Sequence, residues 1–169
     1  MFWLLSAALL LWFPLLGSLA AADPRQPFYG VWRLVRYELK DKATGKVKLP
    51  YTDKPEGRIT YDQQGRMSAQ LMRPGRKPLS GRIPQAGAAN SIENAAAEEV
   101  RDAAIGFIAY YGTFDVLPGE RTVVHHVKAS LLPNWVGTDL RRQYEFKGHT
   151  LTLMADTPAY VGILVWERE

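Results

Sequence analysis

The stretch GVWRLVRYEL (residues 30–39) opens the folded part of the chain, and Trp166-Glu167-Arg168 stands at its other end. The first stretch is rich in β-branched and aromatic residues, as strands are. Short alternating segments separated by turn residues lie between the two ends. This arrangement predicts a β-barrel that its first and last strands close. A barrel of this size either packs its interior or encloses one small apolar cavity.

Seven further segments have strand composition, and turn residues separate most of them. The clearest hairpin signal is Asp62-Gln63-Gln64-Gly65, because an alternating run lies on each side of this turn. We predict an all-β fold, an eight-stranded antiparallel up-and-down barrel, with a loop and its own short hairpin over residues 40–56. The seven segments are 57–61, 66–72, 109–117, 122–130, 138–146, 149–155 and 161–168.

Between the third and fourth strands the apolar pattern changes to the spacing of a helix. Residues 73–89 are rich in Pro and Gly and predict a loop. Asn90 or Ser91 can then cap a helix, and Glu93 follows three residues after Asn90, as in a capping box. We therefore expect one inserted α-helix over about residues 92–107.

The first 22 residues carry no charged side chain and end in Ser18-Leu19-Ala20-Ala21-Ala22. Small residues at this place fit signal-peptidase cleavage after Ala20 or Ala22. We expect a signal peptide at 1–22, one domain at 23–169, and a periplasmic or secreted protein. The alternative is a membrane anchor that stays uncleaved, because no Lys or Arg precedes the apolar run.

Charge and composition exclude several classes of protein. The chain has no cysteine, which excludes disulfides, thiol catalysis and cysteine-ligated metals. Its net charge of +4 is scattered, whereas nucleic-acid binding needs a dense basic face. The three histidines lack the spacing of a zinc site. We expect no metal, no cofactor, no nucleic acid, no stable membrane span after signal cleavage, and a monomer.

Several short motifs follow one another along residues 30–168 in the order of one family. They are Gly30-Val31-Trp32-Arg33-Leu34, Gly57-x-Ile59-x-Tyr61, Gly65-x-Met67-Ser68, Tyr111-Gly112-Thr113-Phe114, His125-His126-Val127, Pro133-Asn134-Trp135-x-Gly137-Thr138-x-x-x-Arg142, Leu151-x-Leu153 and Trp166-x-Arg168. In these motifs the chain resembles the lipocalin-like domain proteins of bacteria, relatives of the lipocalins in the calycin group. The resemblance implies a calycin-type barrel and little about chemistry, because fold defines the family. The inserted helix departs from ordinary lipocalins.

Trp32 has two interpretations. A large aromatic side chain is usually core, so we expect Trp32 to plug the closed end of the barrel. The resemblance implies that Arg168 lies over its ring, where a cation is attracted to the π face. The alternative is a wall on which a ligand stacks.

Arg142 stands on the apolar side of an alternating strand. Leu140, Tyr144 and Phe146 share its face, while the alternate positions are all polar. A guanidinium that points into a barrel needs an anionic partner. That partner is a carboxylate of the protein, with Asp115 and Glu38 as candidates, or a carboxylate of a ligand.

His125 and His126 lie on opposite faces of one strand, so only one of them is internal. The pattern favours His125, and a β-bulge would reverse the choice. An internal histidine can be a general base, a haem ligand or a hydrogen-bonded core residue. Five tyrosines in the predicted strands can also offer hydroxyls to a ligand, although strand composition alone accounts for them. They are Tyr37, Tyr61, Tyr110, Tyr111 and Tyr144.

We expect a protein that binds a small hydrophobic or amphipathic molecule inside the barrel, anchored by Arg142. Tyr61, Met67, Leu71, Phe114, Leu140, Tyr144 and His125 would line its pocket. An enzyme of the same fold, such as an isomerase, cyclase or hydrolase acting on a hydrophobic metabolite, is the first alternative. It would pair an internal histidine with Asp115 or a tyrosine. A filled barrel would leave a structural or protein-interaction module that uses the 73–89 loop. Nothing argues strongly for an enzyme, since no nucleophile elbow, phosphate loop or dinucleotide motif occurs.

Overall fold

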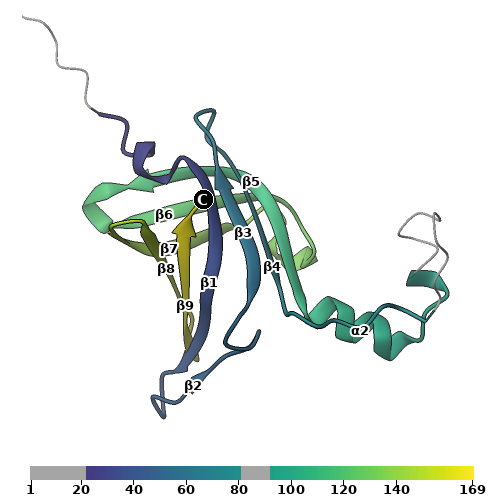
Figure 1. Cartoon of the computed structure of the whole chain (residues 1–169). Helices are drawn as coiled ribbons and strands as arrows, with labels where there is room; N and C mark the ends of the chain where they lie inside the picture. The colour runs from purple at the N-terminus through teal and green to yellow at the C-terminus, as the bar shows by residue number, and fades with distance from the viewer. Residues whose placement is uncertain (1–21, 81–91) are drawn as a thin grey trace, which may run out of the picture.

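The computed structural model describes residues 22–80 and 92–169 (Figure 1). Strands account for most of this part of the chain. The strands are β1 (Gly30–Asp41), β2 (Val47–Lys48), β3 (Glu56–Tyr61), β4 (Arg66–Met72), β5 (Phe107–Leu117), β6 (Thr122–Ser130), β7 (Asp139–Lys147), β8 (Thr150–Asp156) and β9 (Tyr160–Arg168). The helical elements are the 3-10 turns η1 (Gln26–Phe28), η2 (Pro118–Glu120) and η3 (Pro133–Trp135) and the α-helix α2 (Ala97–Ile105).

The strands form one antiparallel sheet in the order β2-β1-β3-β4-β5-β6-β7-β8-β9, and β1 also pairs with β9. This last pairing closes the barrel, so the predicted eight-stranded up-and-down barrel is confirmed. Strand β2 is a short hairpin partner of the end of β1, where Leu39 pairs with Lys48. It lies in the segment for which a short hairpin was expected.

Strand β1 pairs with β3 and β2 along one edge and with β9 along the other. Its first residues, Gly30 to Arg33, pair with β3, and the stretch from Trp32 to Asp41 pairs with β9. The register with β9 shifts between Leu34 and Arg36, which marks a bulge. A bulge increases local twist and bends the strand, and closure of a small barrel requires such a bend.

The inserted helix is shorter than predicted. Its N-cap is Ala96, whose backbone N–H donates to Glu99 Oε2 at 3.3 Å, and the predicted caps Asn90 and Ser91 lie outside the described residues. The helix ends at Ile105 because Phe107 already pairs with Met72 in the β4–β5 ladder. Figure 1 shows α2 extending away from the barrel, and none of its side chains is buried.

One end of the barrel is closed by aromatic packing. Phe28, carried by η1, is completely buried and meets Tyr61, Tyr144 and Phe146 edge-on, with ring centroids 4.9–5.4 Å apart. Sequence patterns missed this plug because Phe28 precedes the first strand and belongs to no alternating run. Edge-to-face geometry is the favourable arrangement for such rings.

Trp32 and Arg168 lie at the same closed end. The Arg168 guanidinium carbon is 4.0 Å from the centroid of the buried Trp32 ring. The Trp32 indole N–H donates to the Phe28 carbonyl at 2.7 Å, and Arg168 donates to the Tyr29 and Pro27 carbonyls at 2.6 Å. The last strand therefore fastens the segment that carries the plug.

Candidate functional site

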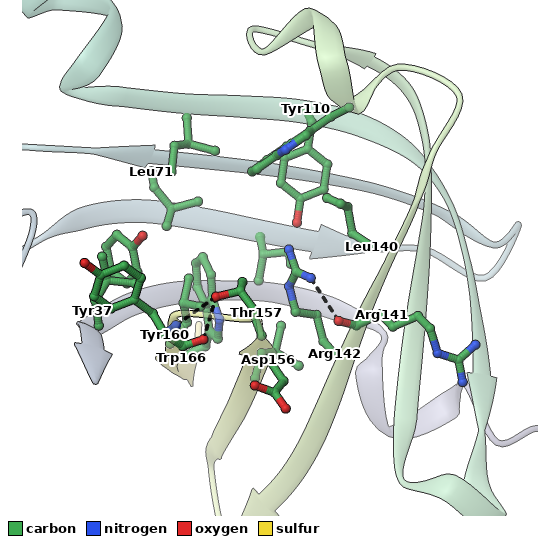
Figure 2. Close-up of a pocket in the computed structure, with 18 of the residues that line it drawn as sticks. Tyr37, Leu71, Tyr110, Leu140, Arg141, Arg142, Asp156, Thr157, Tyr160 and Trp166 are labelled. Atoms are coloured by element: carbon green, nitrogen blue, oxygen red, sulfur yellow. Dashed lines mark hydrogen bonds between the residues drawn. The ribbon is translucent and has the colours of Figure 1, made fainter. Parts of the chain in front are cut away.

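A pocket of 540 Å³ lies within the barrel (Figure 2), and neither Phe28 nor the rings that contact it edge-on are part of its wall. Its walls are mainly apolar and aromatic, and they come from seven of the nine strands and from η3. The aliphatic residues are Leu39, Ile59, Leu71, Ile108, Leu140, Leu153 and Leu164, and the aromatic ones are Tyr37, Tyr110, Trp135, Tyr160 and Trp166. The barrel is therefore not filled by its side chains, and a drug-sized molecule fits a pocket of this volume.

Three of the residues expected to line the pocket do so, namely Leu71, Leu140 and Arg142. The other five expected residues are packed around the plug or beneath the pocket and are not part of its wall. Strand alternation indicates which side chains point inward, but it carries no information about depth along the barrel axis. The five residues are Tyr61, Met67, Phe114, Tyr144 and His125.

Arg142 reaches the pocket from β7, whose side chains alternate between half-buried and exposed as predicted. In the part of the chain that the structure describes, its hydrogen bond is from Nη1 to the Arg141 carbonyl at 2.9 Å, and no carboxylate pairs with it. Both expected partners are engaged elsewhere: Asp115 contacts His126, and Glu38 pairs with Arg36. The proposed internal pairing was wrong, and the guanidinium keeps most of its donors free.

His125 is the internal histidine, with no exposed surface. Its Nε2 lies 2.8 Å from the Tyr61 hydroxyl, and its Nδ1 lies 3.0 Å from the Tyr110 hydroxyl. Burial, followed by the nearby positive charge of Arg142, lowers the pKa of His125 to about 3. The imidazole is therefore neutral near pH 7 and joins two tyrosines from β3 and β5.

His126 points to the opposite face of β6 and meets two carboxylates. Its Nδ1 is 2.6 Å from Asp139 and its Nε2 is 3.1 Å from Asp115. The hydrogen bond to Asp139 is the main cause that raises the pKa of His126. The test for the enzyme alternative is a histidine that meets a carboxylate at an open pocket. His125 contacts two tyrosines and is not part of the pocket wall, and Asp115 contacts His126 instead.

Two of the five tyrosines that sequence reasoning could not tell apart line the pocket, Tyr37 and Tyr110. Trp135 of η3 also lines it and packs edge-on against Tyr110, with ring centroids 5.6 Å apart. The signal for Tyr110 was weak because four other tyrosines had the same strand context. Of these, Tyr111 is 56% exposed, so neighbours in sequence have opposite environments.

Within residues 22–80 and 92–169, no group of three or more His, Asp or Glu side chains is placed to hold a metal ion. No helix in the same two ranges is both long and apolar enough to cross a membrane.

Comparison with known proteins places the chain in a family. Residues 29–168 match the lipocalin-like domain. The chain belongs to the lipocalin-like domain family. A protein of Aspergillus oryzae named 4'-hydroxy-3'-methoxypropiophenone carrier protein ppsC is 34% identical over 114 residues, which cover 60% of this chain and 96% of the relative. A redesigned β-barrel of solved structure aligns with this lipocalin-like chain at a TM-score of 0.41 and 8% identity, covering 85% of this chain and 93% of the other.

Proposed function

We propose that this protein is a carrier for a small amphipathic molecule, which it holds in the barrel pocket with an oxygen-bearing group at Arg142. The observation that carries the proposal is a guanidinium in a largely apolar pocket without a carboxylate partner among the described residues. A partly desolvated cation without a partner is unfavourable, and a ligand oxyanion would supply the missing acceptor.

The remainder of the pocket suits an aromatic or aliphatic body. Tyr37, Tyr110 and Trp135 offer ring surfaces, and leucine and isoleucine side chains form much of the rest. Burial of apolar ligand surface would supply the bulk of the affinity, while Arg142 would fix the orientation. The name of the A. oryzae relative describes a phenolic aryl ketone, so 4'-hydroxy-3'-methoxypropiophenone is a suitable first probe for this chain.

The role of Arg142 is tested with two ligands that share a twelve-carbon chain and differ in the head group, an anionic carboxylate or a neutral hydroxyl. Titration calorimetry would compare dodecanoate with dodecanol on the unaltered protein and on Arg142→Ala. A hydrogen-bonded charge contributes about 1.5–3 kcal/mol, so dodecanoate affinity should fall about 10- to 150-fold while dodecanol changes less than about 3-fold. Arg58→Ala is the matched control, because Arg58 pairs with Glu169 on the outer surface. Equal losses for acid and alcohol would remove Arg142 from the binding mechanism.

The carrier function itself is tested on protein purified without detergent. Native mass spectrometry before and after organic extraction should show an adduct that extraction removes, and the adduct mass identifies the class of ligand. A clean apo mass, together with no uptake of fatty acids, alcohols or the aryl ketone, would refute the carrier function.

We also propose that residues 1–22 direct export and that the mature protein is periplasmic or secreted. The uncharged apolar stretch and the small residues that end it support this proposal. Expression in a bacterial host followed by fractionation should place the protein outside the cytoplasm, with a mature N-terminus at Ala21 or Asp23. Full-length protein in the membrane fraction would support the uncleaved anchor instead.

A further inference from the structure

The Tyr61–His125–Tyr110 chain contains one more hydrogen than it can use. A neutral imidazole carries one N–H, and each tyrosine carries one O–H, so the three side chains hold three donor hydrogens. Only two contacts join them, Tyr61 to Nε2 and Tyr110 to Nδ1. One tyrosine hydroxyl must therefore find an acceptor outside the chain.

Burial decides which hydroxyl carries the unused hydrogen. Tyr61 is 2% exposed and packs against the Phe28 and Phe114 rings, at centroid distances of 5.4 and 4.7 Å. An O–H group without an acceptor in that position would lose its hydrogen bonds to water and form no other hydrogen bond. Tyr110 also is nearly buried, but it lines the pocket (Figure 2). The favourable arrangement has Tyr61 donating to Nε2 and Nδ1–H donating to Tyr110.

We propose that Tyr110 is a second ligand-binding residue, whose hydroxyl donates to an oxygen acceptor of the ligand, and that Tyr61 and His125 position this hydroxyl. The inference rests on the proposed carrier function, because the acceptor belongs to a molecule in the same pocket. Arg142 also enters this pocket and acts electrostatically on Tyr110. The two residues together present donors, which select ligands rich in carbonyl, carboxylate or phenolate oxygen over amines and plain hydrocarbons.

The tautomer of His125 tests the hydrogen count directly. Nitrogen-15 NMR of uniformly labelled protein at pH 7 distinguishes the two neutral forms of each imidazole. We expect His125 to be in the Nδ1–H form, with no change to the imidazolium until the pH falls far below 6.5. Finding the Nε2–H form would place the unused hydrogen on Tyr61 and overturn the inference.

Binding measurements then test the donor role of Tyr110. The probes are 4'-hydroxy-3'-methoxypropiophenone, 3'-methoxypropiophenone without the phenol, and 2-methoxy-4-propylphenol without the carbonyl. Tyr110→Phe should weaken the parent about 5- to 10-fold, as loss of one hydrogen bond does, and one of the two analogues less than about 2-fold. Tyr61→Phe should show the same selectivity with a smaller loss. Tyr111→Phe is the control, since its side chain is exposed.

The outcomes separate this inference from the function on which it rests. Equal losses for all three probes in Tyr110→Phe, together with a lower unfolding temperature, would mean that the hydroxyl only supports the fold, and the inference would fail while the carrier function stood. A thermal unfolding measurement on each variant identifies a loss that comes from damage to the barrel. If the unaltered protein binds none of the probes, dodecanoate or dodecanol, the carrier function fails and the inference fails with it.

Discussion

His125 should make the stability of the barrel fall steeply in mild acid. Its folded pKa of about 3 lies far below the ordinary value of 6.5, because the buried ring would have to take up a proton without a carboxylate partner. The unfolded chain binds this proton at 6.5 and the folded chain does not, so lowering the pH favours unfolding. The contribution of the neutral His125 to the free energy of unfolding is full above pH 6.5 and is lost as the pH falls toward 3.

The magnitude follows from the two pKa values. Because protonation of His125 is coupled to unfolding, this residue alone lowers the free energy of unfolding by about 2 kcal/mol between pH 7 and pH 5. Below that, each further pH unit costs about 1.4 kcal/mol until the folded pKa is reached. This is a large part of the 5–15 kcal/mol that typically stabilises a folded domain.

Urea denaturation at pH 7 and pH 5, on the unaltered protein and on His125→Gln, isolates this effect. The amide of glutamine can contact both tyrosines but does not titrate, so its barrel should lose about 2 kcal/mol less between the two pH values. All other titrating groups are common to both proteins and cancel in the comparison. The same pH dependence in both proteins would refute the buried, neutral histidine.

Three further predictions concern the frame around the pocket. Phe28→Ala should lower the free energy of unfolding by about 3–5 kcal/mol in urea denaturation, because it empties the closed end; a loss below 1 kcal/mol would show that the plug is dispensable. Gly112→Ala should prevent folding, since its Cβ would stand 1.9 Å from the His126 carbonyl oxygen, whereas Gly119→Ala, with no atom within 4 Å, should unfold at the same temperature as the unaltered protein. Asp139→Asn should move the pKa of His126 down toward 6.5 in an NMR titration, because the Asp139 carboxylate raises it, and an unchanged pKa would contradict the contact. The raised pKa of His126 stabilises the fold below pH 6.5, and this stabilisation is lost as the pH rises through the folded pKa.

The strands could be predicted from the sequence because each carries its own signal. Alternation and turn residues placed β6 at Thr122–Ser130 without error, and β4 likewise, since a half-buried strand needs nothing beyond its own residues to be recognised. The joining of β1 to β9 followed from the strand composition at the two ends of the domain. The helix boundaries were less accurate because the start of β5 competes for Phe107.

The site was harder to predict because it depends on register between strands. Tyr61, Tyr110 and His125 come from three strands, and a bulge at Tyr111/Gly112 in the β5–β6 pairing sets where two of them meet. No periodic pattern encodes that offset. The direction of Arg142 was predictable from β7 alone, whereas the absence of a partner depended on Asp115 and Glu38, which other strands hold elsewhere.

The first and last described residues of the domain lie at the same end of the barrel. Arg168 holds the carbonyls of Pro27 and Tyr29, the Glu169 N–H donates to Val31, and Figure 1 shows the chain entering and leaving there. The two ends of the domain therefore lie at the plugged end of the barrel, away from the pocket. A fusion partner or surface linker joined at either terminus would leave the pocket unobstructed. Under the alternative in which the apolar N-terminal stretch stays uncleaved as a membrane anchor, the anchor would join the barrel at its plugged end.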